Sequence, residues 1–151
     1  MMATRATYQF WSKHNPIITV YLHHDNYPLG AAVHLFNEVT EAPVRSVEEF
    51  IRINPKAIIT EDHAAHGDTD YRYDIFFNPR NHKHNIDRIM VFARNFPKAD
   101  LEESWTELDH VSLKVFCDKH IRFSSGELCP NALELMCTRE RLVTELQEWE
   151  P

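Results

Sequence analysis

The sequence predicts a single α+β domain: a largely antiparallel sheet of about five strands, with helices packed on one face and an amphipathic helix at the C-terminal end. Three observations support this fold class. Short segments alternate apolar and polar residues, which is the period of half-buried strands. Other segments place apolar residues three and four positions apart, as amphipathic helices do. Along the chain, strands come first, then helices, then strands again, and this order favours helices layered on one face of the sheet.

Length and composition fit one ordered domain over residues 1–151. The chain is 43% hydrophobic and 26% charged, which is ordinary for a globular protein. Its three cysteines, Cys117, Cys129 and Cys137, leave one unpaired in any disulfide scheme and fit reduced thiols. The start of the chain lacks the apolar run of a signal peptide, and no later stretch is long enough to span a membrane. We therefore expect a cytoplasmic protein.

The first two expected strands cover residues 6–11 and 16–22, and the short polar connection between them predicts an antiparallel hairpin. A polar turn, residues 23–26, then leads into a helix over residues 29–39, with Pro28 in the first turn, where helices tolerate proline. Four apolar residues of this helix repeat with helical spacing and are expected to face the core: Ala32, Leu35, Phe36 and Val39.

A second, shorter helix is predicted by Ser46 and Glu49, which have the spacing of a capping box. It should end near Asn54, because Pro55 disfavours a helical conformation in the residue before it. The first two of the strands expected after it are interpreted as a second hairpin, with a polar loop between them. These later strands cover residues 57–61, 70–77 and 86–93.

The last third of the chain is less uniform. Residues 101–120 suit a helix by one set of apolar positions and a strand by another, and we predict a helix. Asn131 and Glu134 resemble a capping pair, which predicts an amphipathic helix over about residues 131–149, either continuous or broken near Thr138.

Composition argues against several classes of function. A net charge of −7 is unfavourable for a general binder of phosphate backbones, so we expect no direct nucleic-acid binding. Aromatic residues around Tyr71 and Tyr73 could stack on bases, but such residues more often belong to a core. Only three glycines are present, too few for a glycine-rich phosphate cradle, and no serine lies in a G-x-S-x-G elbow.

Ten histidines are many for a chain of this length, and several lie beside aspartates in polar segments. Imidazole and carboxylate together suit zinc or manganese, and an open coordination position could activate water for hydrolysis, for example of a phosphodiester. The same residue types also form ordinary polar turns, and no spacing here is that of a helical HExxH or a paired CxxC motif. A metal-dependent hydrolase is therefore our alternative interpretation, with four candidate ligands: His23, Asp25, His63 and His66.

Strand geometry places His23 and Asp25 on the same side of the chain and His24 on the other. We expect Asp25 to accept hydrogen bonds from backbone N–H groups at the start of the following helix and so to serve the turn. On this hypothesis, replacing Asp25 by alanine lowers stability by about 1 kcal/mol, the usual cost of losing a helix cap.

The same segment carries a resemblance. Residues 21–32 resemble a Tyr-x-His-x-Asp-Gly-Tyr-Pro-x-Gly-Ala-Ala pattern found in small uncharacterised proteins of bacteriophages and prophages. These proteins also have a later Tyr-Arg-Tyr strand like residues 71–73, and the resemblance as a whole covers about half of the chain at most. Asn26 stands where the pattern has glycine, and both residues tolerate a left-handed turn. The resemblance implies a phage-type accessory protein that acts in the bacterial cytoplasm by binding a host protein. The matching residues are Tyr21, His23, Asp25, Tyr27, Pro28, Gly30, Ala31 and Ala32.

Our first functional hypothesis is therefore a non-enzymatic interaction protein without a cofactor, for example an inhibitor of a bacterial defence or regulatory complex. Its oligomeric state is left open. We expect an acidic helix face to dock on a basic groove of a partner that itself binds nucleic acid. That face would hold Asp100, Glu102, Glu103, Glu107 and Asp109. Other expected binding residues are His23, Asp25, Tyr27, Tyr71 and Tyr73.

Overall fold

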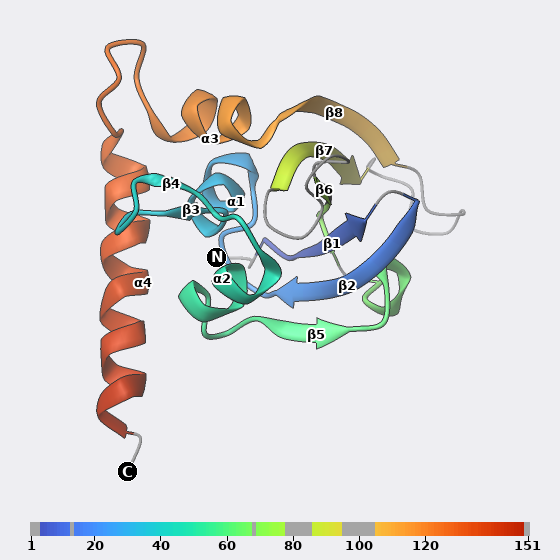
Figure 1. Ribbon diagram of the computed structural model, residues 1–151, viewed down its shortest axis with the longest axis horizontal. Helices are drawn as coiled ribbons and strands as arrows, with labels where there is room; N and C mark the ends of the chain where they lie inside the picture. Colours follow the sequence, from blue (N-terminus) through green and yellow to red (C-terminus); the bar gives the residue numbers. More distant parts are fainter. Residues whose placement is uncertain (1–3, 13, 68, 78–85, 95–104, 150–151) are drawn as a thin grey trace.

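The computed structural model describes residues 4–12, 14–67, 69–77, 86–94 and 105–149, the side chains of 146–149 excepted (Figure 1). Within these ranges the chain forms a six-stranded mixed sheet with the order β5-β2-β1-β6-β7-β8. Neighbouring strands are antiparallel, except that β1 and β6 are parallel. The strands are β1 (Ala6–Ser12), β2 (Asn15–Leu22), β5 (Ile58–Thr60), β6 (Tyr71–Phe77), β7 (Ile86–Arg94) and β8 (Trp105–Ser112).

The predicted α+β class is confirmed, although the described part of the sheet has six strands and not five. A small second sheet pairs β3 (Phe36–Asn37) with β4 (Ala42–Pro43). Helix α1 lies against α3 and α4, and α2 also contacts α4. Figure 1 shows α4 running along one side of the molecule. The helices are α1 (Pro28–His34), α2 (Val47–Ile53), α3 (Leu113–Ile121) and α4 (Pro130–Trp149).

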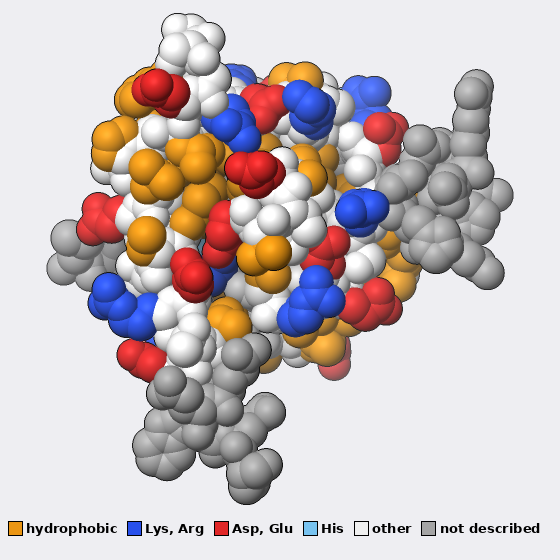
Figure 2. Space-filling model, turned by 60° about the vertical axis from the view of Figure 1, so that its left-hand side comes forward, with side chains coloured by type: hydrophobic (Ala, Val, Ile, Leu, Met, Phe, Trp, Pro, Cys, Tyr) orange, Lys and Arg blue, Asp and Glu red, His pale blue; other side chains and the backbone are white. Residues whose placement is uncertain are grey.

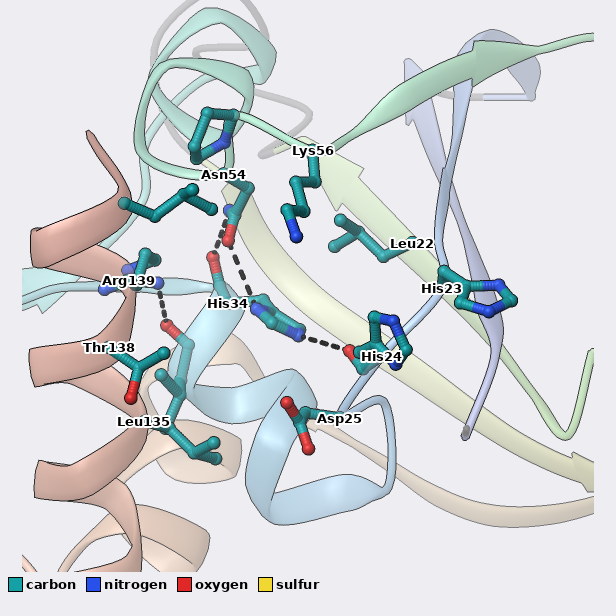
Figure 3. Close-up of a pocket in the computed structure, with 13 residues that line it drawn as sticks. Leu22, His23, His24, Asp25, His34, Asn54, Lys56, Leu135, Thr138 and Arg139 are labelled. Atoms are coloured by element: carbon teal, nitrogen blue, oxygen red, sulfur yellow. Dashed lines mark hydrogen bonds between the residues drawn. The ribbon is translucent and has the colours of Figure 1, made fainter. Parts of the chain in front are cut away.

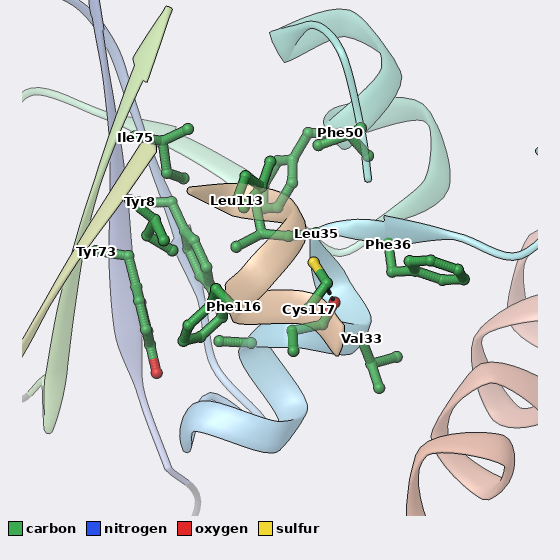
Figure 4. Packing of buried hydrophobic residues seen from close by; sticks show 14 of the residues in the cluster. Tyr8, Val33, Leu35, Phe36, Phe50, Tyr73, Ile75, Leu113, Phe116 and Cys117 are labelled. Atoms are coloured by element: carbon green, nitrogen blue, oxygen red, sulfur yellow. Dashed lines mark hydrogen bonds between the residues drawn. The ribbon is translucent and has the colours of Figure 1, made fainter. Parts of the chain in front are cut away.

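Alternation along the central strands divides their side chains between two faces of the sheet. On β1 and β6, one set points toward the helices and forms the core, where Tyr8, Tyr73 and Ile75 are fully buried (Figure 4). Leu35, Phe50, Leu113, Phe116 and Cys117 meet them from the helical side. The aromatic residues of the Tyr-Arg-Tyr strand therefore serve packing on this side.

Helix α1 is shorter than predicted, because it ends at His34 and the chain then extends into β3. Three tertiary contacts take carbonyl groups that a longer helix would use internally. Arg139 donates to the carbonyls of Val33 and Phe36, and the Asn54 side chain donates to that of His34. The predicted core position of Val39 is wrong, since this side chain is 87% exposed.

The second predicted hairpin is also wrong. β5 pairs with β2, whereas β6 pairs with β1 and β7, so the two strands lie on opposite sides of the first hairpin. The connection includes a short 3-10 helix, η1 (His63–Ala65), whose His63 contacts Thr7 on β1. This connection carries the chain past the hairpin, so that β6 pairs with β1 on one edge and with β7 on the other.

The predicted helix over residues 101–120 is wrong for 105–112, which form β8, and right from 113, where α3 begins. The Ser112 hydroxyl caps α3 by accepting from the backbone N–H of Val115.

Helix α2 forms as predicted, with the Ser46 hydroxyl accepting from the backbone N–H of Glu49. The predicted C-terminal helix is confirmed and continues through Thr138 without a break. None of the described helices combines the length and apolar character that crossing a membrane requires.

Candidate functional site

The turn between the end of β2 and the start of α1, residues 23–27, forms a strand-to-helix junction. It is organised by Asn26, which is completely buried between the sheet and α1. Its side-chain amide donates to the carbonyls of Thr4, Leu22 and His24 at 2.9–3.0 Å. Its Oδ1 accepts from the Tyr8 hydroxyl at 2.6 Å. An amide supplies donors and an acceptor together, so one side chain holds the start of the chain, the end of β2 and the core.

Two stacked tyrosines support Asn26 from the sheet. The Tyr8 and Tyr73 rings lie 4.9 Å apart, and the Tyr73 hydroxyl donates to the Asn26 carbonyl at 2.6 Å. Burial raises the pKa of Tyr8, helped by the negative charge of Asp25, and burial also raises the pKa of Tyr73. Both hydroxyls therefore stay protonated as donors. Tyr73, an expected binding residue, has no exposed surface and belongs to this support.

Asp25 does not cap α1, contrary to the sequence-based expectation. Within the described part of the chain, the helix has Tyr27 at its N-cap position, and that side chain makes no capping hydrogen bond. Asp25 instead occupies a left-handed conformation, with φ +58°, and leaves its carboxylate exposed. The turn brings its carbonyl so close to Gly30 that a Cβ at Gly30 would lie 1.9 Å from the oxygen.

A groove of about 260 Å³ opens between this junction, α2 and α4 (Figure 3). Its walls are mainly apolar, and polar groups gather along its rim. On the face that carries α4, hydrophobic side chains gather between acidic and basic ones (Figure 2). The apolar lining residues are Leu22, Val33, Pro55, Leu135 and Leu142. The polar lining residues are His23, His24, Asp25, His34, Asn54, Lys56, Thr138 and Arg139.

His34 lies in the middle of the groove wall, where its two ring nitrogens face two acceptors (Figure 3). Nδ1 is 3.2 Å from Asn54 Oδ1, and Nε2 is 3.2 Å from the His24 carbonyl oxygen. Burial and the positive charge of Arg139 lower the pKa of His34 to about 4, although the His24 carbonyl, Asp25 and Asn54 act in the opposite direction. The imidazole is therefore neutral at pH 7.

Arg139 forms the α4 side of the groove and is 92% buried, with 8% of its surface exposed. Besides the carbonyls of Val33 and Phe36, its guanidinium pairs with the carboxylate of Glu38. Burial lowers the pKa of Arg139, and the Glu38 carboxylate opposes this shift. The guanidinium thus joins α4 to the end of α1, with its charge already balanced.

The four predicted metal ligands are not brought together. His23 Nδ1 accepts from Arg5 Nε and lies 3.0 Å from the Tyr21 hydroxyl. The His66 ring stacks on Tyr21 at 4.0 Å, and His63 bonds to other strands. Among the described residues, no group of three or more His, Cys, Asp or Glu side chains has an arrangement that could hold a metal ion.

His63 belongs to a different constellation, which sequence reasoning missed. Its Nε2 donates to Asp74 Oδ1 at 2.8 Å, and its Nδ1 is 2.5 Å from Thr7 Oγ1. A hydroxyl, an imidazole and a carboxylate in series resemble a nucleophilic triad. However, Thr7 is completely buried, so no substrate can reach its oxygen. Trp11 donates to the same carboxylate oxygen, and the cluster attaches η1 to the sheet.

The predicted acidic helix face is corrected to part of a strand. Glu107 and Asp109 lie on β8, where Asp109 pairs with Lys119 at 3.0 Å and Glu107 is exposed. Asp100, Glu102 and Glu103 lie outside the described residues. Tyr27 and Tyr71 are partly buried.

Sequence reasoning placed His23, His24 and Asp25 at a junction but missed the rest of the groove. The signal for Arg139 was available, because it lies four positions after Leu135 and three before Leu142, on an otherwise apolar stripe. No comparable signal marks His34, Asn54 or Lys56. No protein-family model, curated protein or solved structure matches this chain.

Proposed function

We propose that this protein is a non-enzymatic accessory protein of phage type that binds a host protein in the bacterial cytoplasm, with the groove beside α4 as its anchor site. The observation that carries the proposal is the size and lining of the groove. At about 260 Å³ it is smaller than most small-molecule pockets, which enclose roughly 300–1,000 Å³. One side chain of a partner protein fits such a volume.

The lining supports the same proposal. Protein interfaces draw most of their affinity from a few side chains that fill desolvated pockets, surrounded by a polar rim. Leu22, Leu135 and Leu142 would supply the desolvated floor, and His24, Asp25 and Lys56 the rim. The phage and host assignments rest on the resemblance of residues 21–32 alone. No contact among the described residues favours the metal-dependent hydrolase, and we do not propose it.

Two substitutions on α4 test the proposal as a matched pair. Thr138 lines the groove, whereas Thr144 is exposed on the same helix outside it. Both hydroxyls donate to the carbonyl four residues earlier at 3.0 Å, so Thr138→Trp and Thr144→Trp lose the same local bond. Thr138→Trp fills the groove.

The tagged protein and both variants are used to recover partners from bacterial lysate, and a recovered protein is then titrated against each by calorimetry. We expect Thr138→Trp to abolish binding and Thr144→Trp to bind like the parent, with similar melting temperatures for all three. Equal affinity of the partner for both variants would show that the groove is not the anchor site.

A further inference from the structure

The groove contains two hydrogen-bond acceptors that face one another with no donor between them, and the orientation of the Asn54 amide is the reason. The Asn54 amide nitrogen donates to the carbonyls of His34 and Phe50 at 2.9 and 2.8 Å. These two acceptors determine the orientation of the amide, so its oxygen must face His34 Nδ1. Asn54 is buried, with 3% of its surface exposed, and its oxygen therefore requires a donor.

This requirement selects the tautomer of His34. A neutral imidazole has one N–H, and placing it on Nδ1 satisfies the buried Asn54 oxygen. The second proton that Nε2 would need is disfavoured, because burial and Arg139 hold the pKa of His34 near 4. Nε2 then carries a lone pair, and the atom facing it at 3.2 Å is the His24 carbonyl oxygen.

His34 Nε2 and the His24 oxygen are thus two acceptors side by side, and neither can donate to the other. The contact lies in the wall of the groove, where His34 is partly buried and His24 is exposed. The next residue, Asp25, adds an exposed carboxylate to the rim at the same end, as Figure 3 shows. No hydrogen bond joins this carboxylate to the side chains or backbone that the structure describes.

We propose that the groove accepts a cationic group, an ammonium or guanidinium on an apolar stem, whose N–H donors meet His34 Nε2, the His24 carbonyl and the Asp25 carboxylate. The inference rests on the proposed function and specifies its anchor: a lysine or arginine side chain of the partner. Its aliphatic part would lie along Val33, Leu135 and Leu142, as the stems of basic residues do on apolar surfaces.

The charge of the protein favours this occupant. The protein carries a net charge of −7, which favours a basic partner. Arg139 opposes a second cation, since its positive charge also lowers the pKa of His34, and its ion pair with Glu38 offsets part of that charge. Lys56 is a second opposing group, and it reaches toward the groove from the side across from Asp25 (Figure 3). Removing its charge should therefore strengthen binding of a cation and weaken binding of an anion.

The test uses full-length protein and two probes, Nα-acetyl-lysine methylamide and Nα-acetyl-norleucine methylamide, which share a side-chain stem and differ by the ammonium group. Their binding is measured by NMR titration at pH 7.5. We expect the lysine probe to bind about ten-fold more tightly than the norleucine probe, the usual scale of a charge-assisted hydrogen bond. The ring nitrogens of His34 should show Nε2 unprotonated before the probe is added.

Three variants complete the design. Asp25→Asn should remove the preference for the lysine probe, Lys56→Met should increase it, and Glu107→Gln, which deletes the same charge on β8, should leave it unchanged. Equal affinity for both probes, no binding of the lysine probe, or an Nε2-protonated His34 would each overturn the inference. If the norleucine probe binds and Thr138→Trp abolishes that binding, the groove remains the anchor site and only its cationic occupant is wrong.

Discussion

At the scale of single residues, the junction depends on Asn26 and Gly30 more than on the side chain of Asp25, the residue before Asn26. Asn26 satisfies carbonyls of two separate segments, and Gly30 lets α1 approach the Asp25 carbonyl. Asp25 contributes a backbone conformation with positive φ, which aspartate and asparagine adopt more readily than most residues. Asp25→Asn is therefore suited to remove the charge while keeping the turn.

Gly30→Ala should be strongly destabilising. The added Cβ would lie 1.9 Å from a backbone oxygen, which cannot move aside as a flexible side chain can. We expect a loss of roughly 2–4 kcal/mol in the free energy of unfolding, measured by urea denaturation. Gly67→Ala is the control, because nothing lies within 4 Å of its Cβ, and it should change stability by less than about 0.5 kcal/mol. Equal losses in both variants would contradict the close approach of α1.

His34 should make the fold less stable in acid. Its pKa is lowered from 6.5 to about 4 in the folded protein, so between these values the unfolded chain binds a proton that the folded protein does not. The free energy of unfolding then falls as pH drops through this window, by on the order of 2–3 kcal/mol. His24, Asp25, Asn54 and Arg139 are the groups around the ring that set this pKa.

Urea denaturation between pH 4 and 7 gives the free energy of unfolding of the parent and of His34→Gln. The contribution of His34 is the difference between the two proteins in how that free energy changes with pH. The pKa of His120 is also lowered, by burial and then by Lys119, and its contribution is present in both proteins. We expect the parent to lose more stability than His34→Gln over the window. Parallel curves for the two proteins would mean that His34 titrates alike in the folded and unfolded states.

At the scale of elements, α1 and α4 depend on one another through Arg139. The helix periodicity of residues 29–39 would allow a longer α1, but Arg139 and Asn54 take its last carbonyls and the chain turns into β3. The long helix α4 in turn joins the domain through Ala132, Met136 and Arg139, its buried residues among those described.

Arg139→Leu should weaken this attachment, because Glu38 and two carbonyls would lose their partner. Breaking a buried ion pair from one side costs about 3–5 kcal/mol, and we expect a loss of this size in urea denaturation. Arg141→Leu removes the same charge from an exposed position on the same helix and should cost less than about 0.5 kcal/mol. Similar denaturation midpoints for the two variants would show that the Arg139 contacts contribute little.

At the scale of the whole molecule, the parallel pair β1 and β6 forms the middle of the six-stranded sheet, with two of its described strands on each side. Core side chains of both strands are fully buried under the helices. The edge strand β5 is short and carries Ile58 and Ile59 with more than half of their surface exposed, at 57% and 62%. Stability should therefore decrease from the centre of the sheet toward this edge.

Amide hydrogen exchange measures that gradient directly. We expect the amides of Tyr8 and Tyr73 to exchange only by global unfolding, whereas those of β5 exchange by local opening and at least about a hundred-fold faster. Adding urea should accelerate exchange of the central amides much more than that of β5. Protection of β5 equal to that of β1 would contradict a centre formed by the parallel pair.

The sequence by itself determined the elements whose signals lie within a few neighbouring residues. Local apolar patterns predicted β1, β2, β5, β6 and β7, the spacing of Ser46 and Glu49 predicted α2, and an apolar stripe predicted α4. It also placed polar residues at the end of β2. Each of these signals is local, because the period of a strand or helix and the geometry of a cap involve only nearby positions.

Beyond the first hairpin, whose antiparallel pairing of β1 with β2 the sequence predicted, tertiary structure alone decided which strands are neighbours. It also decided where α1 ends and which polar groups share the groove. β1 meets β6 through pairs such as Ala6 and Tyr71, and Arg139 reaches a carbonyl 106 residues away. The assignment of residues 105–112 was likewise settled by pairing with β7, since their local pattern suits both helix and strand. Such contacts join distant parts of the chain, and they stabilise the protein only when the core has brought those parts together. A pattern of neighbouring residues therefore does not predict them.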